Sequence, residues 1–301
     1  MRIHAIINER AGSALGQDPA AIEAAIKEPF AKHGHDVEVE FSAPDKLVAA
    51  IEAAATRREC DVIVVGGGDG TVRSGARIAV QSGKTLGILP LGTLNRMARD
   101  LGIPLDVASA AAALAAGSTG RIDVASVNGQ MYLCNSLIGL PPAYSAERAR
   151  LRGRPFAERM TGYAQVFKSI LSSRQRLHVT VDDGSEQKPL RVLSMAVANN
   201  AYCEKPGLGL TRPVLDGGEL AVYASRHRSG WGMAKALLRA VLGRWTGDPH
   251  LEQFRGHDIV VRIARPQLKI SNDGELETMS TPLRYKTHPR ALSILLPARP
   301  A

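Results

Sequence analysis

The chain has 301 residues, 45% of them hydrophobic, so it is long enough to bury one large core or two ordinary ones. Its 38 basic and 29 acidic residues give a formal net charge of +9, which favours an anionic partner: nucleotide phosphates, nucleic acid or an anionic membrane surface. Only 4% of the residues are aromatic, which leaves few rings to stack on bases, and we therefore expect no nucleic-acid partner.

Signals for export, membrane crossing and a zinc site are missing from the sequence. The start, MRIHAIINERAG, has no basic segment followed by an apolar stretch and a cleavage site, and no apolar run reaches about 18 residues. We therefore expect a cytoplasmic protein. Cys60, Cys134 and Cys203 are odd in number and far apart, which suits neither a disulfide framework nor a zinc site, and core positions are the simpler interpretation.

Strand and helix patterns alternate over the first 120 or so residues. The expected strands are residues 3–7, 37–41, 61–65 and 86–89, and the expected helices are residues 18–30, 44–57, 71–81, a short one from 95 and one over 105–116. Asp18-Pro19 is a typical helix start, with an N-cap followed by proline at the first helical position. Alternation of this length predicts a mostly parallel, doubly wound α/β sheet.

The pattern changes from about residue 122. Strand candidates rich in valine and isoleucine occur at residues 177–181, 192–197, 220–223, 259–263, 268–270 and 292–296. Asp183-Gly184 and Asp273-Gly274 are turn signals between them, and the pattern predicts an antiparallel sandwich. Two amphipathic helices interrupt it, with their apolar faces at Phe156, Met160, Tyr163, Phe167 and Ile170 and at Leu237, Leu238, Val241 and Leu242.

The first of two glycine-rich turns follows a fully apolar strand. It consists of Gly66, Gly67, Gly68, Asp69, Gly70 and Thr71. Glycines let the backbone turn tightly and expose N–H groups, and the start of the next helix favours negative charge, so the turn predicts a phosphate site. It has neither the Gly-Lys-Ser/Thr of a Walker A loop nor the last glycine of Gly-x-Gly-x-x-Gly.

Asp69 would repel a phosphate in this turn unless a magnesium ion lay between them. The plainer interpretation is that Asp69 caps the helix, and the turn alone does not decide between the two. A second strand–turn–helix unit follows about 25 residues later, with Gly92, Thr93 and Asn95 at its helix start. Two such turns on successive parallel strands lie at the carboxyl edge of the sheet, which together predicts a nucleotide site.

These stretches resemble the catalytic domain shared by diacylglycerol kinases, sphingosine and ceramide kinases and bacterial lipid kinases. The matching stretches are residues 67–71 (GGDGT), 89–95 (LPLGTLN) and 98–104 (ARDLGIP), Asp123 with 127–129 (VNG) and Asn135, and residues 216–220 (DGGEL) and 272–275 (NDGE). The resemblance covers nearly the whole chain in order. Its Gly-Gly-Asp-Gly-Thr part is also shared with NAD kinases.

The resemblance implies an architecture. The N-terminal α/β domain would comprise residues 1–123, the C-terminal β-sandwich residues 124–289, and the last strand, about 290–301, would return to the first domain, with the active cleft between the domains. It also implies that ATP lies against Gly66–Thr71 and Gly92–Asn95, with Asn8 and Ser42 nearby.

The resemblance implies catalytic and metal-binding residues as well. Asp273 would be the general base and Glu275 its acidic companion, Asp69 and Asp123 would hold a magnesium ion through water, and Asp216 a second, structural one. Phosphoryl transfer needs magnesium, in-line positioning and a carboxylate near the attacking hydroxyl. Taken without the family, Asp273-Gly274 is a plain hairpin turn, and Asp123 and Asp216 are turn residues.

Arg96 departs from the family pattern, because many members have an aspartate directly after the asparagine of the second turn. A fixed cation replaces a carboxylate there. Either the change is harmless, or it alters metal binding, or the protein has lost kinase activity. Asp100, one helical turn further on, is placed to pair with Arg96.

The implied substrate is a hydroxyl on a membrane-derived lipid, so the expected partner is an anionic membrane surface at the inner face of the membrane. Two segments are candidates for that contact: the helix of residues 231–245, with Lys235, Arg239 and Arg244, and an arginine run at Arg148, Arg150, Arg152, Arg154 and Arg159. An ordinary packed helix and a solvated loop are the plainer interpretations. The competing functions are an NAD kinase and a non-catalytic lipid- or nucleotide-binding protein; the sequence is silent on oligomeric state.

Overall fold

The computed structural model describes residues 1–12, 18–139, 176–206, 210–227 and 230–298. The chain forms two compact units, one of Met1–Val124 with Pro289–Ala301 and one of Ala125–His288. The second unit is therefore an insertion between parts of the first. The predicted apolar helix around Phe156–Ile170 and the arginine run of residues 148–159 lie outside the described residues. No helix among the described residues is long and apolar enough to span a membrane.

The first unit is built on a parallel sheet. Its strands are β1 (Arg2–Asn8), β2 (Asp36–Ser42), β3 (Val62–Gly67), β4 (Thr85–Pro90) and the end of β16 (Leu283–Leu296), in the order β2-β1-β3-β4-β16. Every neighbouring pair is parallel, and β5 (Ser118–Val127) also pairs with β16. All six residues of β3 are buried, as expected for a strand covered on both faces.

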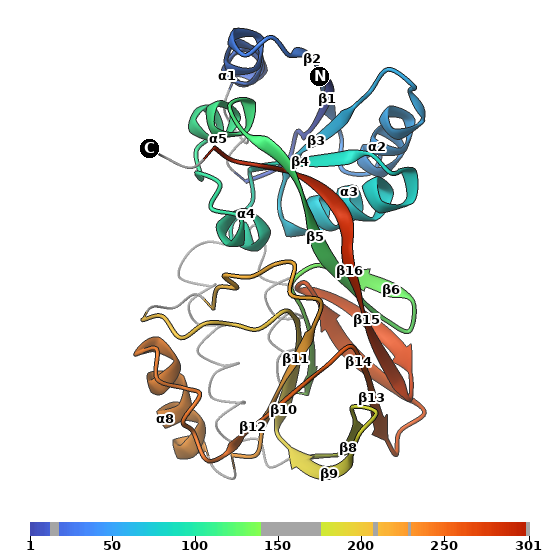
Figure 1. Cartoon of the computed structure of the whole chain (residues 1–301), viewed down its shortest axis with the longest axis vertical. Helices are drawn as coiled ribbons and strands as arrows, with labels where there is room; N and C mark the ends of the chain where they lie inside the picture. The colour runs from blue at the N-terminus through green and yellow to red at the C-terminus, as the bar shows by residue number, and fades with distance from the viewer. Residues whose placement is uncertain (13–17, 140–175, 207–209, 228–229, 299–301) are drawn as a thin grey trace. The chain divides into compact units, whose positions relative to one another are not determined.

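Helices cover both faces of this sheet. They are α1 (Pro19–Lys32), α2 (Leu47–Thr56), α3 (Asp69–Ser82), α4 (Arg96–Asp100) and α5 (Val107–Ala115). In Figure 1, α1 packs against α5 on one side of the strands, and α2 packs against α3 on the other. The doubly wound α/β architecture expected from the alternating pattern is therefore confirmed.

Two of the boundaries that differ from the prediction in this unit have a clear physical reason. The second helix begins at Leu47 rather than residue 44, because the Lys46 N–H donates to the Ala43 carbonyl at 3.0 Å and closes a separate turn first. The third strand continues through Gly66 and Gly67, which pair with Leu89 and Pro90 of β4. The glycine-rich turn is therefore shorter than its sequence indicates, and α3 begins at once after Gly68.

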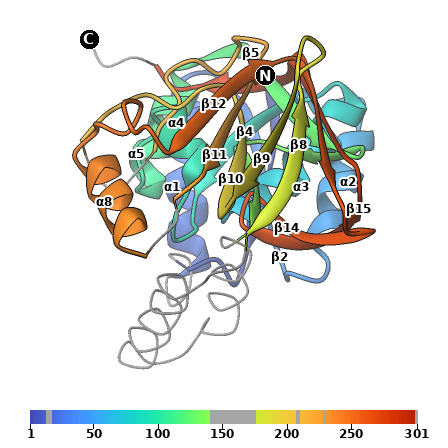
Figure 2. The same cartoon turned by 90° about the horizontal axis from the view of Figure 1, so that it is seen from below.

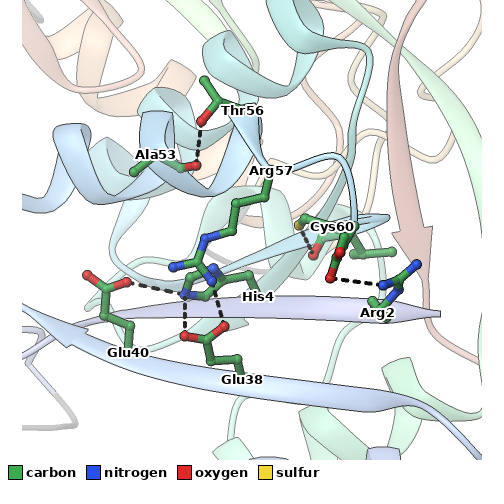
Figure 3. A network of polar contacts seen from close by, with 10 residues as sticks. Arg2, His4, Glu38, Glu40, Ala53, Thr56, Arg57 and Cys60 are labelled. Carbon is green, nitrogen blue, oxygen red and sulfur yellow. Dashed lines mark hydrogen bonds and ion pairs between the residues drawn. The ribbon is translucent and has the colours of Figure 1, made fainter.

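The outer strand of this sheet is held by a polar network (Figure 3). His4 is buried at the middle of β1, and its Nε2 lies 3.2 Å from a carboxylate oxygen of Glu40 on β2. Glu38, also on β2, accepts a hydrogen bond from Arg57 at 2.6 Å. These contacts connect β1 and β2 to the residue that follows α2.

The second unit consists of antiparallel strands in two sheets. One has the order β12-β11-β10-β7-β14-β15, and the other β16-β13-β8-β9, with β5 paired to β16 and β6 paired to β5. The bounds are β6 (Gln130–Tyr132), β7 (Asn135–Gly139), β8 (Leu177–Asp182), β9 (Gln187–Val192), β10 (Ser194–Asn199), β11 (Leu220–Ser225), β12 (Leu251–Gly256), β13 (Asp258–Ile263), β14 (Gln267–Asn272) and β15 (Glu275–Ser280). Buried side chains from both sheets form one core, with Ile138, Val197 and Val222 from the first and Val181, Ile259 and Tyr285 from the second.

This arrangement confirms the predicted sandwich. Asp183-Gly184 joins β8 to β9 and Asp273-Gly274 joins β14 to β15, as their turn signals predict. The helix α8 (Gly230–Val241) follows β11 and stands at the side of the strands in Figure 2.

Candidate active site

The predicted phosphate-binding residues lie at the carboxyl edge of the parallel sheet. Asn8 pairs with Ser42 at the ends of β1 and β2, and Ile7, just before Asn8, pairs with Gly66 of β3. Since β1 and β3 are neighbours and the helices that follow them cover opposite faces, their ends form the topological switch point where such sheets bind ligands. Register alone thus brings the ends of three strands together.

The two glycine-rich turns touch each other through their backbones. A Cβ atom on Gly92 would overlap the Cα atom of Gly68, and one on Gly67 would overlap the side chain of Thr71. The Leu91 N–H also donates to the Gly67 carbonyl at 3.1 Å. Side chains are therefore excluded from the contact, and the backbones of the two turns approach each other directly.

Asn95 holds the second turn in shape. It has a left-handed backbone conformation, with φ at 48°, and its side-chain oxygen accepts from the Gly92 N–H at 2.8 Å. Its Nδ2 donates back to the Gly92 carbonyl at 2.8 Å. The Asn95 amide, predicted to contact the nucleotide, is thus engaged within the turn, whereas Thr93 between them is exposed.

Asp69 connects the two turns. It is the first residue of α3, yet its Oδ1 accepts a hydrogen bond at 2.7 Å from the backbone N–H of Arg96, the first residue of α4. The plainer interpretation of Asp69 was a cap on its own helix; the structure shows it bonded to the start of the next one. Because this contact uses the backbone of Arg96, it does not depend on which side chain stands at position 96.

These features suit a nucleotide phosphate and its magnesium ion. A Cβ atom at Gly67 in the first turn or at Gly92 in the second would overlap neighbouring atoms, so both turns require glycine. The first turn leads into the 14-residue helix α3, whose N-terminus carries partial positive charge. Magnesium usually keeps several waters and binds proteins through one or two carboxylates together with substrate phosphates. Asp69 supplies one carboxylate at that position.

The three aspartates predicted to bind magnesium do not form one cluster. Asp123 is buried in β5, and its Oδ1 accepts from the Arg290 N–H at 2.7 Å, which joins β5 to β16. Asp216 is an exposed residue of the second unit, ahead of β11. Within the described part of the chain, no three histidine, cysteine, aspartate or glutamate side chains gather to hold a metal ion.

Asp273 is held in a socket of backbone N–H groups. It is 8% exposed and has φ at 50° in the turn between β14 and β15. Its two carboxylate oxygens accept from the N–H groups of Leu133 and Cys134 at 2.7 Å each and from that of Asn135 at 3.1 Å. Asp273 therefore has a structural task as well as its predicted catalytic one. Glu275, two residues on, is exposed at the start of β15.

A buried arginine supports the same loop, and sequence reasoning missed it. Arg212 is 1% exposed, and its Nη1 donates to the carbonyls of Leu133 and Asn199 at 2.7 Å each. Nearby, Asn135 donates to the Tyr202 hydroxyl at 2.5 Å. Arg212 stands between a threonine and a proline in an irregular segment, where nothing in the sequence distinguishes it from a solvated arginine.

Comparison with known proteins assigns both parts of the chain. The diacylglycerol kinase catalytic domain matches residues 2–127, and the YegS C-terminal NAD kinase beta sandwich-like domain matches residues 150–296. Diacylglycerol kinase of Bacillus subtilis is 36% identical over 115 residues, covering 36% of this chain and 37% of that protein. A probable lipid kinase YegS-like of Klebsiella pneumoniae is 40% identical over 87 residues, 28% of this chain and 29% of that one.

The chain spans about half or less of the length of the curated relatives that it matches. An uncharacterized protein of Synechocystis is 28% identical over 78% of this chain, and the match covers 54% of that protein. A crystal structure of a diacylglycerol kinase from Bacillus anthracis str. Sterne superposes with a TM-score of 0.73 at 19% identity, covering 98% of this chain and 96% of that one, which shows the shared fold. The two matched domains, in this order, show that the chain belongs to the diacylglycerol kinase catalytic-domain family, which includes the YegS-like lipid kinases.

Proposed function

We propose that this protein is an ATP-dependent lipid kinase that transfers the γ-phosphoryl group of ATP to a hydroxyl of a membrane-derived lipid. The observation that carries the proposal is the backbone contact between the two glycine turns, with Asp69 bonded across them at the carboxyl edge of the sheet. Such an edge offers converging N–H groups and one carboxylate, which is the set that triphosphate and magnesium require. Family membership supports the lipid rather than the NAD branch.

Most of the predicted residues have a task in this scheme; Asp123 and Asp216 have none. The N–H groups of residues 68–71 and 93–95 would bind the phosphates, since Gly66 and Gly67 belong to β3 and the Gly92 N–H is bonded to Asn95. Asp69 would orient magnesium. When bound, the ion supplies charge neutralisation at the phosphate oxygens. Asn8 and Ser42 would line the nucleotide at the neighbouring strand ends.

Asp273 would accept the proton of the attacking hydroxyl. An ionised carboxylate has about four lone-pair positions, and at Asp273 three N–H donors of the described residues occupy three of them. One position is left for a substrate hydroxyl, and the socket would fix its direction. Glu275 would act as the exposed acidic companion.

The proposed substrate class includes diacylglycerol, phosphatidylglycerol, ceramide and sphingoid bases, each of which has a hydroxyl beside apolar chains. We place the enzyme at the inner face of the membrane, as a peripheral protein with an anionic surface as its partner. The net charge of +9 supports that partner.

The test is transfer of labelled phosphate from γ-labelled ATP, with magnesium, to mixed micelles that contain a panel of these lipids. Asp69→Asn is the variant to test, because an asparagine side-chain oxygen can still accept from the Arg96 N–H while the negative charge is lost. We expect a loss of at least about a hundredfold in turnover, with ATP binding reduced less. Glu275→Gln, at an exposed position, tests the companion carboxylate without disturbing the socket of Asp273.

The alternatives predict other results. A protein that binds ATP or lipid without labelling any lipid, and that is not rescued by Arg96→Asp, would be the non-catalytic binding protein. Phosphorylated NAD instead of lipid would replace the proposal with an NAD kinase.

A further inference from the structure

The helix α8 presents large apolar side chains to solvent. Trp231 is 73% exposed, Leu238 60% and Leu242, just after the helix, 53%. Positions 231, 238 and 242, with Lys235 between them, repeat at intervals of four, three and four residues, so they form one stripe along the helix. Single exposed apolar residues are ordinary, but three aligned on one helix mark a binding surface.

The end of the helix is fixed to the sandwich. Arg239 lies 3.3 Å from the buried carboxylate of Asp248, which also faces His227 at 3.2 Å. Trp245 is buried and packs edge-on against Tyr223, with ring centroids 5.2 Å apart. These contacts hold the helix in place, so the stripe is a built feature of the second unit.

The basic residues in and after α8 indicate the kind of partner. Residues 230–247 contain Lys235, Arg239 and Arg244 and no acidic residue. The Lys235 ammonium lies 5.8 Å from the centre of the Trp231 ring, so a cation stands directly beside the largest exposed apolar group. Tryptophan and lysine side by side on a basic amphipathic helix suit the boundary between anionic headgroups and acyl chains. A protein groove would supply apolar contacts but would not require the two cations Lys235 and Arg244 near the stripe; the third, Arg239, pairs with Asp248.

We propose that α8 docks on an anionic phospholipid bilayer, with Trp231, Leu238 and Leu242 entering the interface and Lys235 and Arg244 contacting the headgroups. The inference deepens the proposed function, since it assigns the surface by which a lipid kinase reaches its substrate. Binding to vesicles needs neither ATP nor turnover, so it is tested separately from catalysis.

The experiment is cosedimentation of the protein with vesicles of phosphatidylcholine and phosphatidylglycerol, compared with vesicles of phosphatidylcholine alone. We expect Trp231→Gln/Leu238→Gln to weaken binding to the anionic vesicles at least about tenfold, because two exposed apolar groups no longer enter the interface. Leu105→Gln is the matched control: Leu105 is a 41% exposed leucine of the first unit, and its replacement should leave binding unchanged. Wild-type binding should fall as salt is raised.

The chain offers a direct optical readout. It has two tryptophans, of which Trp245 is buried, and none of the described residues accepts a hydrogen bond from its Nε1. Trp245→Phe therefore keeps an aromatic ring at the Tyr223 contact, loses no hydrogen bond to the described residues, and leaves Trp231 as the sole indole. Its fluorescence should shift to the blue on addition of anionic vesicles.

Several results would overturn the proposal. Wild-type protein that ignores anionic vesicles, a double variant that binds as tightly as wild type, or a Trp231 emission unchanged by vesicles would each do so. A wild-type dimer that the double variant converts to monomer, without any vesicle binding, would assign the stripe to a second copy instead. Activity on a water-soluble short-chain diacylglycerol separates the docking proposal from the proposed kinase activity. The docking variant should retain this activity. If wild type lacks it, the result counts against the proposed kinase activity and not against docking.

Discussion

At the scale of single residues, the candidate site depends on the absence of side chains as much as on their presence. Gly68 and Gly92 approach so closely that neither turn could keep its position with a Cβ atom at Gly92. Asp69 and Asp273, in contrast, are charged groups whose oxygens are bonded to backbone N–H groups. Both carboxylates therefore have fixed directions, which a catalytic group requires.

Gly92→Ala should weaken both ATP binding and stability. The new methyl group meets the backbone of Gly68, which cannot rotate away as a side chain would, so the two turns must separate. We expect about 1–3 kcal/mol less stability, measured by urea unfolding, and at least about tenfold weaker ATP binding by calorimetry. Gly247→Ala is the control, since a Cβ atom there meets nothing within 4 Å. Equal ATP affinity in wild type and Gly92→Ala would show that the contact is not part of the site.

At the scale of elements, local capping explains where two of the helices begin. Asp18 and Asp106 precede α1 and α5, and each accepts a hydrogen bond from a backbone N–H of the first turn, that of Ala20 at 3.1 Å and that of Ser109 at 2.9 Å. α1 and α5 pack against each other on the same face of the sheet. Loss of one cap should therefore destabilise both helices.

Asp106→Ala should lower the free energy of unfolding by about 1 kcal/mol, because the Ser109 N–H loses its acceptor. Asp106→Ser retains an acceptor at the cap and should recover most of that loss. The measurement is urea unfolding of all three proteins. A serine variant as unstable as the alanine variant would indicate that the cap hydrogen bond is not the cause.

At the scale of the whole molecule, the second unit interrupts the first, and the chain returns to complete the first sheet. β16 pairs with β13 near its start and with β4 near its end, where Ile294 lies opposite Leu86. Buried polar contacts contribute to the stability of each unit, and in the second unit Asp248 joins α8 to the sandwich.

Asp248 should make stability depend on pH. Burial by itself raises the pKa of its carboxyl, but the N–H of His250 and the nearby His227 and Arg239 outweigh burial, so the pKa is lowered. A lowered pKa in the folded state means that the contribution is complete above the unfolded value, about 4, and is lost as the pH falls through the lower folded value. Thermal unfolding of wild type and Asp248→Asn should thus differ most at neutral pH and converge below about pH 4. A constant difference down to pH 2 would contradict this.

Much of the fold follows from local patterns. Apolar runs, N-caps such as Asp18 and turn pairs such as Asp273-Gly274 act within a few residues, so the α/β unit, the sandwich and both glycine turns could be predicted. Short strands such as β6 could not, because three residues without alternation have no period to detect. β15 was also missed, since its charged and polar residues show no regular apolar alternation.

Only the tertiary structure decided which groups the side chains contact. Asp69 bonds to Arg96, Asp273 to three N–H groups well over a hundred residues earlier, and Arg212 to Leu133, and no local pattern encodes such distant contacts. The exposure of Trp231 likewise depends on which face of α8 the sandwich leaves uncovered. The sequence by itself determined most of the elements and the two glycine turns, because those depend on neighbours along the chain. Burial and hydrogen bonding depend on neighbours in space, and these exist only once the chain has folded.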